Sequence, residues 1–216
     1  MFVRPCWRPK KPLDIRRIIA ENPWALLVSQ TEDGPLATNL PMLIESTAQE
    51  TGVEGLVLVS HLARANEQLA SLRGTGAPVL AIFEGPWSYV TASWYPQRQM
   101  PSTYYYTAVH CYGSIEFQDD ERLDQSLETL VNTMESQYSN GWKTSEIPRS
   151  EVTRRFAGIT GFRLRVTRVE AKFKLGQDEP LRDALAVADE LATHDVAQDS
   201  ALAAMIREQN ADRDPD

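Results

Sequence analysis

The stretch that decides the fold is Trp24-Ala-Leu-Leu-Val-Ser-Gln-Thr-Glu-Asp-Gly-Pro-Leu-Ala-Thr-Asn-Leu-Pro-Met-Leu-Ile44. Residues 24–30 form an apolar run of strand length, and residues 36–44 form a second one. Between them, Thr31-Glu-Asp-Gly34 contains the Asp-Gly pair that is typical of a tight hairpin turn. The stretch therefore predicts two antiparallel strands joined directly by a hairpin.

Similar patterns continue on both sides of this hairpin. Further strands are expected at 55–61, 78–83, 89–94, 104–117 and 159–175. Helices are expected at 12–21, 64–72, 120–138 and 147–156, with two more in the C-terminal tail. Gly85-Pro86 is expected to break the chain between two of the strands. Because the strands are joined by hairpins and not by regular helical crossovers, the order favours an α+β antiparallel barrel over a doubly wound sheet.

The charge of the 216-residue chain is unevenly distributed. Its net charge is −8, and residues 178–216 carry all of it, with eleven acids against three bases. We therefore expect a barrel domain at 1–177 and an acidic helical extension at 178–216, packed on the barrel or on a partner subunit. A neutral body with an acidic tail is not typical of a nucleic-acid-binding protein. Direct contact with DNA stays possible, but the charge distribution does not support it.

Composition excludes several other classes. The sequence has no apolar run long enough to span a membrane and no apolar segment after its basic start, so neither a membrane helix nor a secretory signal is expected. Cys6 and Cys111 are too few for a disulfide scaffold, which favours a reducing cytoplasm. His61, His110 and His194 have no metal-ligand spacing, and no phosphate loop or nucleophile elbow is present.

The segment Val59-Ser-His-Leu-Ala-Arg-Ala-Asn66 is the best candidate for an anion site. A strand ends and a helix begins there, and Ser60, His61, Arg64 and Asn66 are grouped with the free amides of a helix start. A helix N-terminus and an arginine together suit a phosphate. A capped helix with a solvent-facing arginine explains the same residues equally well.

Two other segments could serve a flat, charged ligand. Ser93-Trp-Tyr-Pro96 and Ser102-Thr-Tyr-Tyr-Tyr106 supply aromatic rings beside a loop, although such rings more often belong to a core or an interface. Lys172 and Lys174 share one face of the last strand and could neutralise a flavin, or could simply blunt a strand edge.

Several short motifs, in this order and spacing, are similar to the PaiB-like family of FMN-binding negative transcriptional regulators, over roughly residues 1–210. The motifs are Met1-Phe-Val-Arg-Pro5, Asn22-Pro-Trp-Ala-Leu-Leu-Val-Ser-Gln30, Ala37-Thr-Asn-Leu-Pro41, His61-Leu-Ala-Arg-Ala-Asn66, Val79-Leu-Ala-Ile-Phe-Glu-Gly-Pro86, Ser93-Trp-Tyr-Pro96, Ala108-Val-His-Cys-Tyr-Gly113 and Lys172-Phe-Lys-Leu-Gly-Gln177. The resemblance implies a split β-barrel of the pyridoxamine-phosphate-oxidase type, a homodimer, and FMN bound at the subunit interface.

The resemblance also suggests roles for individual residues. Arg64 and His61 would serve the phosphate, Thr38 and Asn39 would lie beside the ring, Trp94 and Tyr106 would shape the pocket, and Lys172 would approach from the last strand. The complete candidate cofactor set is Thr38, Asn39, Ser60, His61, Arg64, Asn66, Trp94, Thr103, Tyr106 and Lys172.

The chain departs from the family pattern at two places. Tyr104 and Tyr105 stand where the family commonly has tryptophan and asparagine, which removes one expected ring or substrate contact. The family ending Lys-Leu-Ser-Gln-Asn reads here Lys174-Leu-Gly-Gln-Asp178, which adds a negative charge near an anionic ligand.

The preferred hypothesis is an FMN-binding, homodimeric protein of the negative transcriptional regulator type. An FMN-dependent oxidoreductase that uses NAD(P)H on a small molecule is the alternative, and a haem-binding split barrel is a third. No catalytic acid or base is identified, because His110 lies in mid-strand and is more readily explained as a core or interface residue.

Overall fold

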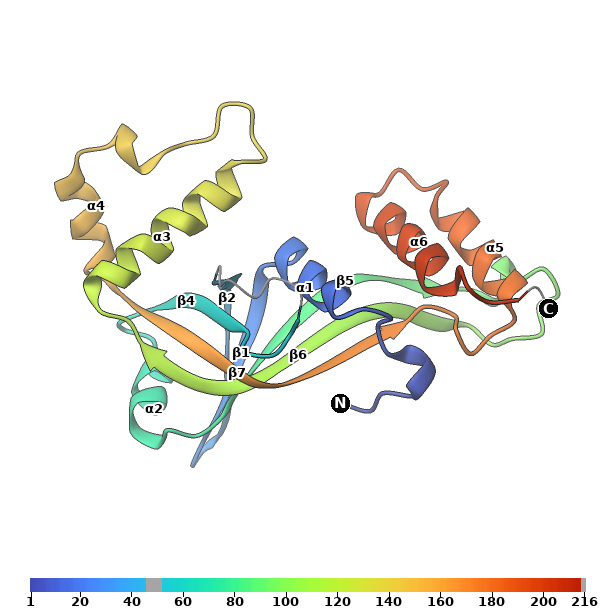
Figure 1. The fold of residues 1–216 in the computed structure, drawn as a ribbon, viewed down its shortest axis with the longest axis horizontal. Helices are drawn as coiled ribbons and strands as arrows, with labels where there is room; N and C mark the ends of the chain where they lie inside the picture. The colour runs from blue at the N-terminus through green and yellow to red at the C-terminus, as the bar shows by residue number, and fades with distance from the viewer. Residues whose placement is uncertain (46–51, 215–216) are drawn as a thin grey trace. The chain divides into compact units, whose positions relative to one another are not determined.

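The computed structural model describes residues 1–45 and 52–214, so the last two residues of the predicted tail, 215–216, lie outside the described part (Figure 1). The elements in chain order are η1 (Pro5–Trp7), α1 (Pro12–Glu21), β1 (Trp24–Thr31), β2 (Gly34–Pro41), β3 (Leu43–Ile44), β4 (Val57–Ala63), α2 (Glu67–Thr75), β5 (Val79–Val90), η2 (Ala92–Trp94), β6 (Thr103–Phe117), α3 (Asp120–Glu135), η3 (Thr144–Glu146), α4 (Arg149–Phe156), β7 (Ile159–Lys174), α5 (Leu181–Leu191) and α6 (Ala197–Asn210). Helices and antiparallel strands are mixed, so the α+β prediction is confirmed.

The strands form one seven-stranded sheet in the order β2-β1-β5-β6-β7-β4-β3. The predicted hairpin is confirmed, since β1 pairs antiparallel with β2 from Trp24↔Pro41 to Thr31↔Gly34. Its returning strand was expected to reach residue 44, but β2 ends at Pro41 and residues 43–44 form β3, which pairs with β4. The two strands at the ends of this order, β2 and β3, are separated in the chain only by Met42. The sheet therefore has to curl until its two edges approach each other, as in a barrel.

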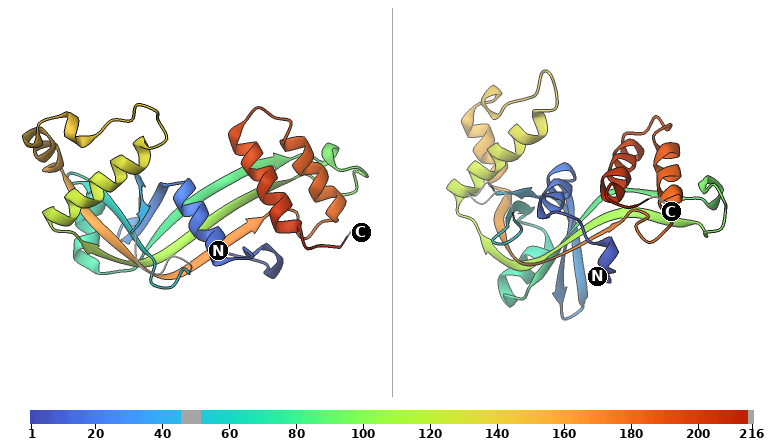
Figure 2. Two further views of the ribbon diagram at one scale, coloured as in Figure 1. Left: turned by 45° about the horizontal axis from the view of Figure 1, so that its top comes forward. Right: turned by 45° about the vertical axis from the view of Figure 1, so that its right-hand side comes forward.

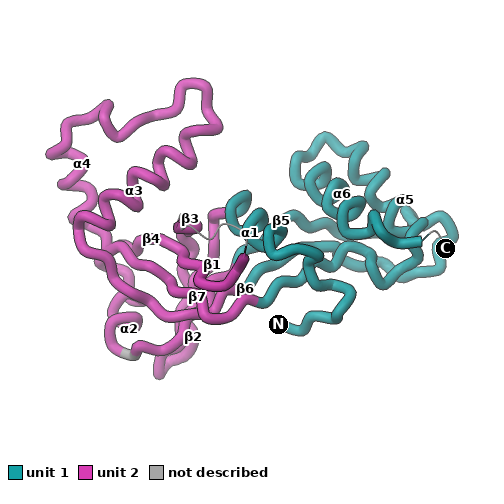
Figure 3. The backbone as a smooth tube through the Cα atoms, in the orientation of Figure 1, with its two compact units in different colours: residues 1–22, 83–110, 170–216 teal, residues 23–82, 111–169 magenta. Residues whose placement is uncertain are grey.

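The chain divides into two compact units (Figure 3). Unit 1 comprises residues 1–22, 83–110 and 170–216, and unit 2 comprises residues 23–82 and 111–169. The strands β5, β6 and β7 contribute residues to both units. The predicted division into a barrel domain at 1–177 and a helical extension at 178–216 stays a prediction.

Unit 2 contains the curled part of the sheet. Here β4 pairs antiparallel with β7 from Val57↔Arg165 to Ala63↔Ile159. Leu27, Leu58 and Leu164 are fully buried inside it. Figure 1 shows α3 beginning over β4, and the buried residues Leu123 and Leu127 fix that first half of the helix.

Unit 1 contains α1 and the two tail helices. Pro12 occupies the first turn of α1, and Ile18 and Ile19 supply its fully buried face. The helices α5 and α6 lie side by side (Figure 2). Asn210 of α6 donates to the carbonyl of Leu175 at 2.9 Å, so the tail is tied to the end of β7.

The prediction that Gly85-Pro86 breaks a strand is wrong, because β5 runs without interruption from Val79 to Val90. A Cβ at Gly85 would lie only 2.2 Å from Thr107 Oγ1, so glycine permits a close approach there. The alternation of burial changes phase at this step: Gly85 is buried, whereas Trp87 is exposed. Trp94, expected at the end of a strand, lies instead in the short helix η2.

The helix expected from residue 64 begins later, at Glu67. Its N-cap is Asn66, whose side chain accepts a hydrogen bond from the backbone N–H of Gln68 at 2.8 Å. Arg64 therefore lies in the turn between β4 and α2, outside the helix.

Candidate functional site

Six of the ten predicted site residues belong to unit 2 and gather around the end of β4. Asn66 Nδ2 donates to Thr38 Oγ1 at 3.2 Å, which ties the start of α2 to β2. Ser60 Oγ donates to the carbonyl of Pro41 at 2.6 Å and is buried. Thr38 and Asn66 are thus in contact, and Ser60 separately ties β4 to the end of β2. These three side chains form a framework that holds the end of β4.

Arg64 differs from these framework residues. Its backbone N–H donates to the carbonyl of Gly158 at 2.9 Å, and its Nε donates to the carbonyl of Ile159 at 3.0 Å. Within the described residues, neither Nη group has a protein partner. The side chain is therefore held at its stem while the guanidinium fork, which suits bidentate binding of phosphate, stays available.

Arg64 lines a cavity of about 210 Å³, the arginine pocket, between the β4–α2 turn and the helices α3 and α4. Asp120, Asp124, Arg149 and Thr153 also line it. Arg149 forms an ion pair with Asp124, which raises the pKa of the arginine. Because one water occupies about 30 Å³, the pocket has room for a phosphate group and its hydration.

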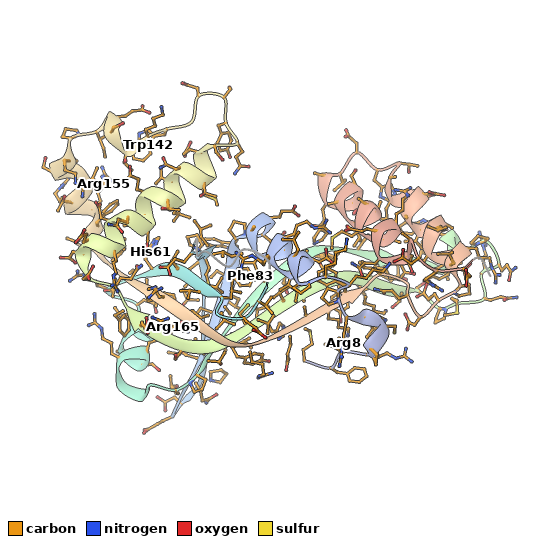
Figure 4. All side chains as sticks on the ribbon, in the orientation of Figure 1. Arg8, His61, Phe83, Trp142, Arg155 and Arg165 are labelled. Atoms are coloured by element: carbon orange, nitrogen blue, oxygen red, sulfur yellow. The ribbon has the colours of Figure 1, made fainter. Side chains whose placement is uncertain are left out.

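His61 lies apart from the arginine pocket, beneath α3 (Figure 4). It is half-buried and lines a cavity of only about 10 Å³ with Leu123 and Leu127. Burial lowers its pKa below the usual 6.5, so the ring is neutral at pH 7. A neutral ring in a cavity this small favours a packing role, whereas a phosphate would need a cationic donor.

The neighbours Thr38 and Asn39 project to opposite faces of β2. Thr38 is the one that lies on the face of Asn66, whereas the side chain of Asn39 is exposed. A ring lying against one face of this strand therefore meets only one of these two side chains.

The other four predicted residues, Trp94, Thr103, Tyr106 and Lys172, belong to unit 1. Lys172 is only 9% exposed, and its ammonium lies 4.5 Å from the ring centre of Trp7, 5.1 Å from that of Tyr106 and 6.0 Å from that of Phe2. Three rings around an ammonium form an aromatic box held by cation–π attraction. Two walls of this box come from the N-terminal segment, which no local pattern had linked to Lys172.

Thr103 and Trp94 have separate partners. Lys174 donates to Thr103 Oγ1 and, at 3.1 Å, to the carbonyl of Tyr104. Trp94 packs edge-to-face on His194 with ring centres 5.8 Å apart. The structure thus brings Tyr106 and Lys172 together, and it places Thr103 and Trp94 in contacts of their own.

The departure at Tyr105 has a structural explanation. Tyr105 is fully buried, and its hydroxyl donates to the carboxylate of Glu179. A Cβ at Gly176 would lie 2.6 Å from that hydroxyl, so the phenol occupies the space that a side chain at position 176 would need. Tyr105 and Gly176 therefore fit together in the core of unit 1.

The departure at Asp178 also has partners. Arg4 Nη1 lies 2.8 Å from Asp178 Oδ2, and Trp7 Nε1 donates to Asp178 Oδ1 at 3.0 Å. The negative charge is thus compensated by the N-terminal segment, which it helps to hold beside Lys172.

A family model matches residues 1–168 of the chain. The chain belongs to the family described as "Putative FMN-binding domain". The FMN cofactor predicted from the sequence is thereby confirmed at the level of the family. Among curated proteins, the chain is similar to "Protease synthase and sporulation protein PAI 2" of Bacillus subtilis, with 25% identity over 88% of this chain and 89% of that protein.

Two solved structures are similar to this FMN-binding family member in fold. The FAD and heme binding protein from Mycobacterium smegmatis matches with a TM-score of 0.55 and 17% identity, over 76% of this chain and 71% of that chain. The flavocytochrome Anf3 from Azotobacter vinelandii matches with a TM-score of 0.55 and 13% identity, over 75% and 66%. At these identities the likeness concerns the fold alone, and it confirms the predicted split barrel.

Two kinds of feature are absent from the described residues. Residues 1–45 and 52–214 contain no cluster of three or more histidine, cysteine, aspartate or glutamate side chains that could hold a metal ion. Among the helices of this same part of the chain, none combines the length and the apolar character needed to cross a membrane.

Proposed function

We propose that this protein is an FMN-binding homodimer with a regulatory role of the PaiB type. The observation that carries the cofactor part is the free guanidinium fork of Arg64 at the arginine pocket, in a chain of an FMN-binding family. The phosphate of FMN would bind this fork, with the framework of Thr38, Ser60 and Asn66 holding the end of β4 behind it. When bound, FMN supplies redox chemistry through its ring, while the protein positions that ring.

The test is a fluorescence titration of purified protein with FMN, comparing the parent with Arg64→Ala. Losing a bidentate contact between an arginine and a phosphate should raise the dissociation constant by about 10- to 100-fold, in line with a charged hydrogen bond of about 1.5–3 kcal/mol. Arg154→Ala is the matched control, because it also removes one positive charge but from an exposed ion pair with Glu151 on α4. Equal FMN affinity for Arg64→Ala and the parent would contradict the proposal.

The absorbance spectrum of the same samples tests the other cofactor. A haem protein would show an intense Soret band, whereas bound FMN gives two weaker bands in the visible and near-ultraviolet. Anaerobic addition of NADPH then tests the oxidoreductase alternative, because a flavin enzyme that uses it would lose its visible absorbance.

The regulatory role is the second part of the proposal, and the similarity to the sporulation protein of Bacillus subtilis supports it. Because the net charge of −8 does not favour contact with DNA, we infer that regulation proceeds through a protein partner or through the state of the flavin. A gel-shift series with the organism's own promoter DNA at low and high salt tests this inference. Salt-sensitive binding at nanomolar protein concentration would show direct DNA contact and refute it.

A further inference from the structure

The end of α3 and the segment that follows it form an arm without a core of its own. From Glu128 to Glu151 no side chain is buried, although the flanking residues Leu127 and Val152 are 5% and 3% exposed. We call residues 128–151 the α3–α4 arm. In Figure 1 this part of unit 2 stands off the strands that the first half of α3 covers.

The arm carries an apolar stripe along one side. Leu127 is buried on the barrel, and the half-buried Leu130 and Met134 follow it at helical spacing before α3 ends. Tyr138 and Trp142 follow in the loop beyond the helix, where they are 65% and 38% exposed and line one hollow together. Because a short helix without tertiary packing is marginal in water, this stripe requires a surface to cover it.

Unit 1 presents an apolar surface of the complementary kind. Trp87, Tyr89 and Tyr104 are 48%, 50% and 52% exposed and form one aromatic cluster. The ring of Tyr104 lies 6.2 Å from that of Trp87 and 5.4 Å from that of Tyr89. Since Tyr105 points into the core of unit 1, its neighbour Tyr104 projects from the other face of β6. Half-exposed aromatic rings that are already preorganised in this way are typical of protein interfaces.

The charges near the two surfaces are opposite in sign. The arm, residues 128–151, has the four acids Glu128, Glu135, Glu146 and Glu151 against the two bases Lys143 and Arg149. The aromatic cluster is bordered by Lys174, whose ammonium bonds to the carbonyl of Tyr104. An acidic helix with a leucine and methionine stripe is therefore a suitable occupant of this cluster.

We propose that the α3–α4 arm of one copy docks its apolar stripe on the aromatic cluster of a second copy, and that the second copy does the same in return. The proposal rests on the homodimer in the proposed function and names its interface. Both surfaces occur on the same chain, so a two-fold dimer covers both of them twice and leaves no open end. A single foreign partner would leave one of the two surfaces uncovered.

The first test compares the dimerisation of stripe and control variants by sedimentation at several concentrations. Met134→Glu places a charge in the middle of the stripe and should raise the dimer dissociation constant at least about 30-fold, as loss of an interface hot spot does. The matched control is Thr129→Glu, an exposed residue on the opposite side of the same helix, which should dimerise like the parent. Circular dichroism establishes that both variants remain folded.

The second test asks directly which surfaces meet. In a Cys6→Ser background, chains carrying Met134→Cys are expressed together with chains carrying Tyr104→Cys and treated with a flexible bismaleimide. Cross-linked dimers containing one chain of each kind support the proposal. Absence of such dimers overturns the proposal. A further variant carries both cysteines on one chain, and a cross-link that forms within that single chain also overturns the proposal.

FMN titrations distinguish a failure of this docking proposal from a failure of the proposed function. If the parent binds no FMN while Met134→Glu still dissociates the dimer, only the proposed function fails. If the parent binds FMN and Met134→Glu dimerises as tightly as the parent, only the docking proposal fails. A parent that remains monomeric at micromolar concentration overturns the homodimer and the docking proposal together.

Discussion

Replacing Gly176 by alanine should destabilise unit 1 more than the same replacement at a glycine with open space around it. Gly176 has a φ of +81°, where residues with a Cβ are strained. Its Cβ would lie 2.6 Å from the Tyr105 hydroxyl and 2.8 Å from the Cβ of Ala184. Both neighbours are fully buried, so neither can yield without moving other parts of the core.

The magnitude has two parts. A non-glycine residue held at positive φ costs about 1–2 kcal/mol. Overpacking a close-packed core by one carbon atom costs about 1–3 kcal/mol. The free energy of unfolding should therefore fall by about 2–5 kcal/mol, which for a chain of this size lowers Tm by about 5–15 °C.

Thermal and urea unfolding of Gly176→Ala and two control variants can separate these parts. Gly55 also has a positive φ, +70°, but no atom lies within 4 Å of its would-be Cβ, so Gly55→Ala isolates the backbone strain. Gly74 lies in α2 with open space around it and no positive φ, so Gly74→Ala should be neutral or stabilising by up to about 1 kcal/mol.

A double-mutant cycle then identifies the atom responsible. Tyr105→Phe removes the hydroxyl nearest to the added Cβ, so it should recover at least about 1 kcal/mol of the loss caused by Gly176→Ala. By itself, Tyr105→Phe should destabilise the protein, because the buried Glu179 loses its donor. If Gly176→Ala costs no more than Gly55→Ala, or if the two effects at 105 and 176 are additive, the proposed coupling of these positions is refuted.

Three further outcomes are expected. Asp178→Ala should cost about 1–2 kcal/mol in urea unfolding, because the buried indole N–H of Trp7 loses its acceptor at 3.0 Å; an unchanged unfolding midpoint would speak against this anchor. Because burial lowers the pKa of His61, the unfolded chain takes up a proton first as the pH falls below about 6.5, so stability should drop between pH 7.5 and 5.5. His61→Gln should show a smaller drop over this range, and an equal one would rule out His61 as the cause. Burial raises the pKa of Cys111 to about 12, so iodoacetamide at pH 8 should label only Cys6 in the folded chain and both thiols after unfolding, as counted by mass spectrometry.

Local sequence patterns determined most of the elements. The apolar runs around Thr31-Glu-Asp-Gly34 predicted the hairpin, and the antiparallel pairing of β1 with β2 confirms it. The stripe that begins at Pro12 predicted α1 with its bounds, 12–21. These predictions succeed because turn chemistry and helical periodicity depend on residues only a few positions apart.

The same local patterns could not predict where β5 ends or which residues surround Lys172. Gly85-Pro86 reads as a breaker, yet β5 continues because Thr107 of a neighbouring strand approaches the bare glycine. The aromatic box of Lys172 depends on Trp7, which lies far away in the chain.

For the candidate site too, one part was predictable from the sequence and another part was decided only by the tertiary structure. The motif from Ser60 to Asn66 was recognisable from the sequence, because its polar residues follow an apolar strand. Only the tertiary structure decided that Arg64 keeps a free guanidinium fork while His61 is a half-buried, neutral ring. The physical reason is that the burial and the hydrogen-bond partners of a side chain depend on segments that come into contact only when the sheet curls. These segments are distant in the sequence, so the residues next to a side chain in the chain do not determine its partners.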